Sequence, residues 1–152
     1  YFKYICKTNQ NRDDSENKYY YLSLKHDKKK DNNWSIHGLW PHYSQTEYPS
    51  YCKKVDFDIN KLDPIIEDLN NYWYSSKEKN DLFWKHEWEK HGSCMFTNMD
   101  ELDYFKTALK LFIDSVQSDS INKFKVSENR SLIPIGIDLK IINDDIITDE
   151  ID

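Results

Sequence analysis

Residues 84–94 read WKHEWEKHGSC and bring two imidazoles, two carboxylates and two ammonium groups into one short stretch. If this stretch is a helix, each residue turns the chain by about 100°, so side chains close in sequence can share a face. One face then carries four titratable side chains: His86, Glu87, Lys90 and His91. Such a concentration of titratable groups is typical of a catalytic site.

The aromatic residues of the stretch predict how the helix packs. Trp84 and Trp88 are four positions apart, so they form a stripe beside the titratable face. We expect this stripe to hold the helix against the core and to shield the polar groups partly from water. Glu89 would then point toward solvent, and Gly92 is expected to end the helix.

Two other interpretations of the stretch are open. A charge-rich segment is often a solvated helix face with ion pairs four residues apart. A His-Glu-x-x-His helix binds zinc in metalloproteases, because its two imidazoles are four residues apart and can share one ion. Here His86 and His91 are five residues apart, which turns the second imidazole by about 140° from the first. This spacing disfavours zinc, and we expect no metal site.

Length and composition predict a single domain over residues 1–152. A chain of 152 residues can enclose one hydrophobic core, and the 15% of aromatic residues supply large side chains to fill it. We expect residues 1–18 and 148–152 to be loop or frayed ends. The chain has no apolar run of the ~20 residues that cross a bilayer, so no membrane partner is expected.

The formal net charge of −6 disfavours a broad basic surface that follows long nucleic acids through many phosphates. Any contact with nucleic acid should therefore be local. Protonation of the five histidines would offset most of this charge. A mildly acidic medium would thus favour an anionic partner.

Cysteines and sequons bear on the compartment. The chain contains Cys6, Cys52 and Cys94, and counting alone does not fix which of them pair. Asn33 and Asn129 each begin an Asn-x-Ser glycosylation sequon, which is compatible with a secretory route. Asn129 is the preferred glycosylation site, because Asn33 adjoins an apolar segment.

Short β-prone segments predict a sheet. We expect strands over residues 19–24 and 34–40, a β-rich segment over 132–139, and a returning strand over 140–147. In the second strand, Trp34 and Ile36 would face one side and His37 the other. Pro41 is expected to end that strand.

Two helices besides the central one are predicted. Asp63 followed by Pro64 is typical of a helix start, and Asp100 is expected to cap a later helix. The later helix has apolar residues at core spacing: Leu102, Phe105, Leu109, Phe112 and Val116. Strands followed by helices and a final β-rich segment give an α+β fold, with a central antiparallel sheet and packed helices.

A second motif lies upstream of the titratable stretch. Residues 36–41 read IHGLWP, and 44 positions after Pro41 the chain continues with KHEWEKHGSC at residues 85–94. Together these two segments closely resemble the two active-site segments of the ribonuclease T2 family. The resemblance covers residues 34–116 and implies a ribonuclease T2-like fold.

The resemblance also implies a chemistry. Members of that family cleave RNA through a 2′,3′-cyclic phosphate to 3′-phosphate ends, without metal or other cofactor. By resemblance, His91 would remove the proton from the ribose 2′-OH and His37 would protonate the leaving 5′-oxygen. Glu87 and Lys90 would stabilise the transition state, and His86 would hold the phosphate. The expected partner is single-stranded RNA and not DNA, because the reaction requires a 2′-OH.

The resemblance assigns further residues. Trp40 would stack on a base, with Tyr48 and Tyr51 as companions, although all three rings could equally pack the loop. His42 departs from the family, where an acidic or amide residue usually follows the proline, so the base preference stays open. Cys52 and Cys94 match positions that pair as a disulfide, which leaves Cys6 without a partner. With the family resemblance, we expect a secreted or endolysosomal protein, and we expect it to be a monomer.

Two other functions of the chain remain open. The first is a catalytically weak RNA-binding or regulatory module on the same scaffold. The second is a zinc hydrolase, which the histidine spacing disfavours.

Overall fold

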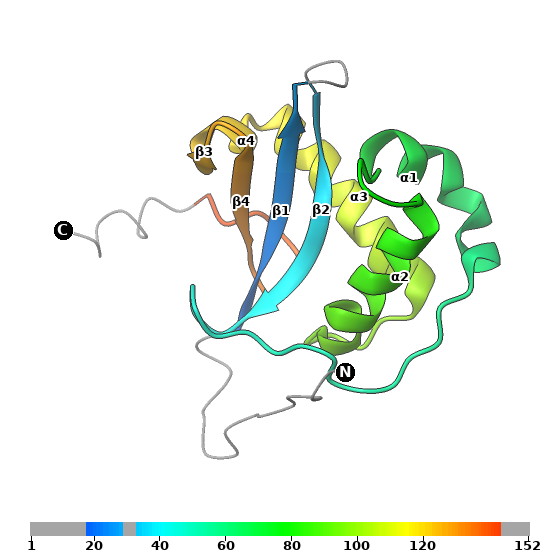
Figure 1. Cartoon of the computed structure of the whole chain (residues 1–152). Helices are drawn as coiled ribbons and strands as arrows, with labels where there is room; N and C mark the ends of the chain where they lie inside the picture. Colours follow the sequence, from blue (N-terminus) through cyan, green and yellow to red (C-terminus); the bar gives the residue numbers. More distant parts are fainter. Residues whose placement is uncertain (1–17, 29–32, 144–152) are drawn as a thin grey trace, which may run out of the picture.

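Four antiparallel strands form one sheet in the computed structural model of the chain, which describes residues 18–28 and 33–143 (Figure 1). The strands are β1 (Tyr19–Asp27), β2 (Asn33–His42), β3 (Lys125–Ser127) and β4 (Arg130–Ile135). Their order across the sheet is β2-β1-β4-β3, so β2 lies at one edge. The predicted α+β class with a central antiparallel sheet is confirmed.

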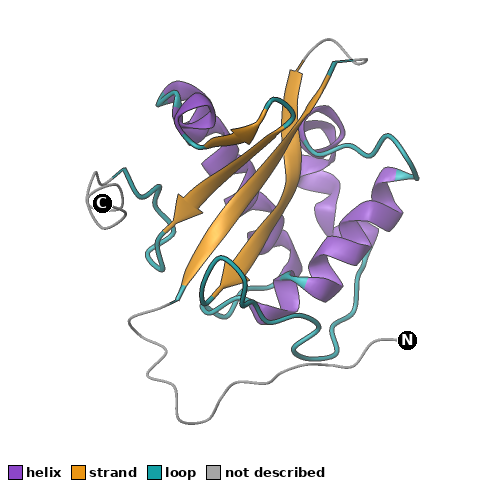
Figure 2. Cartoon of the chain, turned by 60° about the vertical axis from the view of Figure 1, so that its left-hand side comes forward, coloured by secondary structure: helices purple, strands orange, loops and turns teal. Residues whose placement is uncertain are grey.

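The helices form a second layer. They are α1 (Ile66–Tyr72), α2 (Asn80–Lys90), α3 (Glu101–Gln117) and α4 (Ser120–Lys123), with 3-10 turns at Ile59–Ile65 and Gly92–Cys94. In Figure 1, α3 runs behind the sheet while α1 and α2 lie on the side of the edge strand β2. Figure 2 shows the same two layers from another side. The helix with the titratable stretch, α2, therefore lies beside the strand with the second motif.

Pro41 lies inside β2, where it pairs with Tyr20, so the prediction that it ends the strand is wrong. Proline has no N–H to donate to a ladder, and an edge strand is one of the few places in a sheet that tolerates it. The strand continues to His42, which pairs with Tyr19. As a result, Trp40 is held by the sheet.

A β-bulge interrupts β2 at His37. Ser23 of β1 pairs with Gly38 and the next residue, Leu24, pairs with Ile36, so His37 has no partner on β1. A bulge bends a strand and changes the direction of its side chains. Ile36 and Leu39 are therefore both fully buried although they are three positions apart. The predicted alternation holds only up to this point.

Aromatic side chains with satisfied polar groups build much of the core. The indole of Trp73 donates to the carbonyl of His37 (3.1 Å), and that of Trp84 donates to the carbonyl of Trp73 (2.6 Å). The hydroxyl of the fully buried Tyr104 donates to the carbonyl of Leu39 (2.8 Å). Buried aromatic N–H and O–H groups normally need such partners. Two of these bonds end on the backbone of β2 and fix its position.

The first helical segment begins earlier than predicted. Asp58 caps a 3-10 turn by accepting from the backbone N–H of Asn60 (3.0 Å), so Asp63 is not the N-cap. Pro64 lies inside this turn, and α1 follows directly. Because proline cannot donate in an α-helical ladder, it separates the 3-10 turn from the α-helix.

The cap of α3 is confirmed, since the carboxylate of Asp100 accepts from the backbone N–H of Asp103 (2.8 Å). Of the predicted core residues, Phe105, Leu109 and Phe112 are buried, but the side chain of Val116 is 55% exposed. The helix therefore turns a slightly different row of residues toward the sheet near its end.

The C-terminal part differs from the prediction. β4 ends at Ile135, and residues 136–140 form a turn in which Gly136 donates to the carbonyl of Lys140 (2.8 Å). Of the predicted returning strand over 140–147, the structure describes residues 140–143, and among these Ile141 alone forms a bridge, to Ile135. Neither β3 nor α4 was predicted. The residues after 143 lie outside the described part of the chain, as do residues 1–17 with Cys6.

The extent of the domain over 1–152 stays a prediction. Within residues 18–28 and 33–143, no helix has the length and apolar character needed to cross a bilayer.

Candidate active site

The strand and the central helix meet at a hydrogen bond between Trp40 and Glu87. The indole Nε1 of Trp40 donates to Oε1 of Glu87 (2.8 Å). The side chain of Glu87 is almost fully buried, with 2% exposed. The bond thus joins the two sequence motifs at a carboxyl group shielded from water.

The indole of Trp40 also brings two imidazoles together. The ring of His91 stacks on it with centroids 5.0 Å apart and planes at 27°, while the ring of His37 meets it edge-on, also at 5.0 Å. His91 is 4% exposed, and its Nε2 lies 4.0 Å from Oε1 of Glu87. Two imidazoles and a carboxyl group therefore gather around one aromatic ring.

Gly38 permits this approach. A Cβ atom built at Gly38 would overlap both Oε1 of Glu87 and Nε1 of Trp40. The glycine between the histidine and the tryptophan of the motif is thus required by the contact between the two elements.

If the chain cleaves RNA, as its resemblance to the ribonuclease T2 family implies, we predict that Gly38→Ala lowers kcat/KM by about 10²-fold, because displacement by ~1 Å at such a site costs about that factor. Thermal unfolding monitored by circular dichroism would show whether the variant still folds. Gly136→Ala is the matched control, since its added Cβ would meet the side chain of Asp138 far from both motifs in the sequence. A Gly38→Ala variant that folds and cleaves at the wild-type rate contradicts the required contact.

The end of α2 is shaped by His91 and not by a left-handed glycine. α2 ends at Lys90, and His91 is its C-cap residue with φ −111°. Gly92 has no positive φ, so the predicted helix stop is wrong in its mechanism. Gly92 is instead needed because an added Cβ would overlap the ring of Trp88, which is buried like Trp84. The predicted aromatic stripe is confirmed. The ring of Trp88 limits how large the residue at position 92 can be.

A disulfide joins Cys52 to Cys94 and ties the loop after β2 to the end of α2. This is the pair that the family resemblance implies. The backbone N–H of Tyr51 donates to the carbonyl of Lys90 (2.9 Å), and that of Cys52 donates to Oγ of Ser93 (3.1 Å). The loop is therefore fixed against the helix by one covalent bond and two hydrogen bonds.

His86 and Lys90 lie at the outer side of this group. His86 is exposed and Lys90 is half-buried, in contrast to Glu87 and His91. The ring of Tyr51 approaches His86 edge-on, with centroids 6.4 Å apart. The four residues of the predicted face therefore divide into a buried pair and a solvent-accessible pair. An anionic group that reached the buried pair from the solvent side would also meet the accessible pair, His86 and Lys90.

Burial is the main cause of the pKa shifts of Glu87, His37 and His91. It raises the pKa of Glu87 to about 8, although the hydrogen bond from Trp40 opposes the shift. Burial, with Lys25 as the next cause, lowers the pKa of His37 to about 4, and it holds the pKa of His91 well below its usual 6.5. Near neutral pH the site therefore contains two uncharged imidazoles and an uncharged carboxyl group.

The two tyrosines of the predicted base site lie against different histidines. Tyr48 is 49% exposed and its ring centroid is 5.1 Å from that of His42, whereas Tyr51 lies against His86. His42 is buried, and its Nδ1 lies 2.8 Å from the carbonyl oxygen of Ser44. Trp40 already packs between His37 and His91, so its role in base stacking stays a prediction, as do those of Tyr48 and Tyr51.

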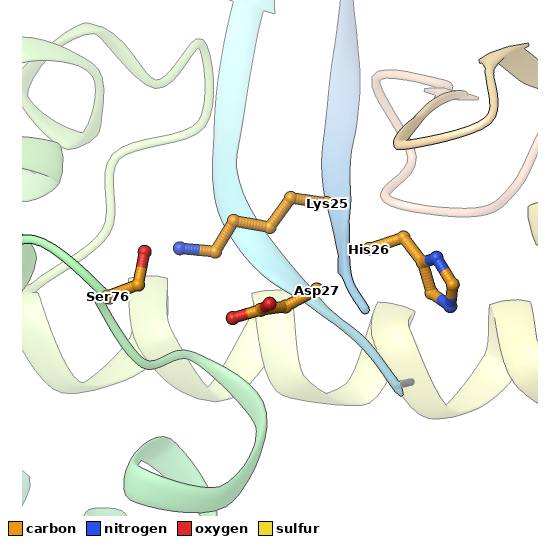
Figure 3. Close-up of a pocket in the computed structure, with 4 residues that line it drawn as sticks. All are labelled: Lys25, His26, Asp27 and Ser76. Carbon is orange, nitrogen blue, oxygen red and sulfur yellow. The ribbon is translucent and has the colours of Figure 1, made fainter. Parts of the chain in front are cut away.

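Sequence reasoning missed Lys25. Its Nζ lies 4.7 Å from the ring centroid of Phe83, and the ring of Phe83 lies 5.8 Å from that of His37. Lys25 also lines a pocket of about 410 Å³ with His26, Asp27 and Ser76 (Figure 3). Only the register of β1 on β2 brings Lys25 to this place, so no local sequence signal marks it.

The Ribonuclease T2 family model matches residues 1–131. The chain belongs to the ribonuclease T2 family. Ribonuclease DdI of Dictyostelium discoideum is 41% identical over 83 residues, which are 53% of this chain and 37% of that relative. The chain thus spans less than half the length of the curated relatives it matches.

Solved structures show the same fold. The RNase-related protein from Calystegia sepium has a TM-score of 0.66 at 18% identity, covering 82% of this chain and 89% of that one. RNase NT in complex with 5′-AMP has a TM-score of 0.65 at 18% identity, with coverages of 82% and 89%. The two motifs that meet at Trp40 and Glu87 therefore lie within a ribonuclease T2 fold.

Proposed function

We propose that the chain is an endoribonuclease that cleaves single-stranded RNA through a 2′,3′-cyclic phosphate, with His91 as base and His37 as acid. The observation that carries the proposal is the placement of both imidazoles on the indole of Trp40, beside the buried Glu87. An imidazole from a strand and one from a helix can then flank a phosphorus atom for in-line displacement.

The proposed steps use groups of the chain and the substrate alone. His91 accepts the proton of the ribose 2′-OH while the 2′-oxygen attacks phosphorus. His37 donates a proton to the 5′-oxygen as its bond to phosphorus breaks. The products are a 2′,3′-cyclic phosphate and a free 5′-OH, and water then opens the ring with the two roles reversed. Each imidazole ends the cycle in its starting state.

Glu87 acts on the transition state in this mechanism. Because burial raises its pKa to about 8, it is a neutral carboxylic acid at acid and neutral pH. Its Oε1 accepts from Trp40, which leaves the hydroxyl free to donate to a non-bridging phosphoryl oxygen. The half-buried Lys90 would add positive charge from the solvent side, and the exposed His86 would hold the phosphate. Neutralising the phosphorane from several directions lowers the barrier.

The nucleophile lies on the substrate, which gives a direct test. We expect a dinucleotide with a 2′-deoxy sugar on the 5′ side of the scissile phosphate to be inert, while the ribose dinucleotide is cleaved. The deoxy compound should still inhibit competitively, because its phosphate and bases are unchanged. Product chromatography should show the cyclic phosphate before any 3′-phosphate. A linear phosphate formed first points to attack by water and contradicts the mechanism.

Metal independence is part of the proposal. We expect RNA cleavage to continue at an unchanged initial rate after dialysis against EDTA, because two imidazoles supply both proton transfers. Loss of activity that Zn²⁺ restores would instead favour the zinc hydrolase.

A catalytically weak RNA-binding module is the second candidate. The specific observation in its favour is the packing of Trp40, which covers one face of the His91 ring and also contacts His37 edge-on. Such a protein would bind the deoxy and ribose dinucleotides equally and cleave neither, so the same experiment separates the two functions.

The proposed location is secreted or endolysosomal. The Cys52–Cys94 disulfide suits an oxidising compartment, and Asn129 lies exposed in the turn between β3 and β4, where a glycan could be attached. We propose that the protein acts there as a monomer on single-stranded RNA and not on DNA.

A further inference from the structure

A groove of about 440 Å³ lies beside α2, between that helix and the loop of residues 51–57. Its volume falls within the ~300–1,000 Å³ typical of small-ligand sites. Three exposed lysines line it: Lys53, Lys54 and Lys85. The groove is therefore large enough for a nucleotide and carries cations at its mouth.

The groove adjoins the candidate active site. His86 lines it and also belongs to the titratable face of α2. Tyr51 lines it as well, and its ring lies edge-on to that of His86 at 6.4 Å. A strand of RNA whose phosphate contacts His86 therefore has this groove next along its path.

The walls of the groove are fixed in place. The loop is bonded to the 3-10 turn after α2 by the Cys52–Cys94 disulfide, and to α2 by the hydrogen bond from the backbone N–H of Tyr51 to the carbonyl of Lys90 (2.9 Å). The indole of Trp88 donates to the carbonyl of Asp56 (3.0 Å) on the same loop. A preformed site of this kind loses little entropy when a ligand binds.

The chemistry of the lining suits a nucleotide. Three lysines face two carboxylates, Asp56 and Glu89, so the groove has a positive balance on a chain with net charge −6. Lysines neutralise backbone phosphates, and aromatic rings such as those of Tyr51 and Phe57 accept stacked bases of any sequence.

We propose that this groove binds a further nucleotide of the RNA strand, beyond the two that flank the scissile bond. Lys53, Lys54 and Lys85 hold its phosphate, and the aromatic wall receives its base. This inference rests on the proposed ribonuclease function, because His86 is shared by the two sites. It makes the preferred substrate an oligonucleotide, and it makes dinucleotides poor substrates.

The test compares two double variants with the same change in charge. Lys53→Gln/Lys54→Gln alters the groove, whereas Lys106→Gln/Lys110→Gln removes two exposed lysines from α3. We expect the groove variant to lose about tenfold in kcat/KM for a pentanucleotide at low salt, as phosphate contacts are weakened, and to keep its kcat/KM for a dinucleotide. The α3 variant should match the wild type on both substrates. When the logarithm of the affinity is plotted against the logarithm of the salt concentration, the α3 variant should keep the wild-type slope, whereas the groove variant should have a smaller slope.

A variant that makes the groove more positive provides a second test. Asp56→Asn removes a negative charge from the groove, so it should raise the affinity for the pentanucleotide and leave dinucleotide cleavage unchanged. Equal losses in the two double variants, or an equal loss on the dinucleotide, would overturn the proposed site.

Binding is measured separately from cleavage, by fluorescence anisotropy with a labelled 2′-O-methyl pentanucleotide that cannot be cleaved. If the wild type cleaves neither substrate, the proposed ribonuclease function fails, and the anisotropy measurements still decide the groove. Weaker binding in the groove variant alone supports the site, and identical binding in all variants overturns it.

Discussion

Replacing His91 with alanine is expected to lower kcat for RNA cleavage by about 10²–10⁴-fold, the usual contribution of a general base. His91 is the most enclosed of the titratable imidazoles at the site, with 4% of its surface exposed, and its Nδ1 has no hydrogen-bond partner within the described residues. A buried imidazole that is not used for structural hydrogen bonding is available for proton transfer. The measurement is the steady-state rate on a ribose dinucleotide.

The chain offers a matched control for this variant. The ring of His26 packs on the indole of Trp34 with centroids 4.9 Å apart, much as that of His91 packs on Trp40. His26→Ala therefore removes the same kind of stacking contact away from Glu87, and it should keep wild-type kcat. Similar losses in both variants would mean that the stacking, and not the proton transfer, matters.

The leaving group distinguishes the two imidazoles. His37→Ala should show a comparable loss on RNA, but it should recover most of its rate on a nucleoside 3′-(4-nitrophenyl phosphate), because that leaving group needs no proton. His91→Ala should remain slow on the same compound, since the 2′-OH must still lose its proton. The opposite pattern would reverse the assignment of acid and base.

The part of the site that could be predicted from sequence is the part encoded locally. The stripe of Trp84 and Trp88 fixes which face of α2 is buried, and the cap at Asp100 fixes the start of α3. The stretch from His86 to His91 predicts that the titratable groups gather on α2 and directly after it. The family resemblance adds the partner strand and the pairing of Cys52 with Cys94, which no count of cysteines provides.

The remaining features depend on contacts between distant segments. The bulge at His37 follows from the pairing of β1 with β2, and the alternation of apolar residues in β2 does not reveal it. The unequal burial of His86 and His91 depends on the position of Trp40, which lies on another element. In the same way, Lys25 reaches the neighbourhood of His37 only through the register of the sheet and the ring of Phe83.

The pH dependence of kcat/KM should have its maximum on the acid side of neutrality. His91 must start neutral, so the rate rises with pH through its pKa, which lies well below 6.5. His37 must start protonated, so the rate falls as pH rises above its pKa of about 4. On that alkaline limb kcat/KM should fall about tenfold for each pH unit. The profile of kcat should lie at higher pH, because a bound phosphate raises the pKa values of both imidazoles.

Lys25 is expected to contribute to the position of the alkaline limb. After burial it is the largest cause that lowers the pKa of His37, and Figure 3 shows its side chain extending from β1 toward Ser76. Lys25→Gln removes this cation, so the pKa of His37 should rise and the alkaline limb of kcat/KM should move to higher pH. Lys28→Gln makes the same change in net charge at an exposed position paired with Glu128, and it should leave the limb in place. A maximum of kcat/KM above pH 7.5 in the wild type, or equal shifts in both variants, would show that His37 is not the acid whose ionisation limits cleavage.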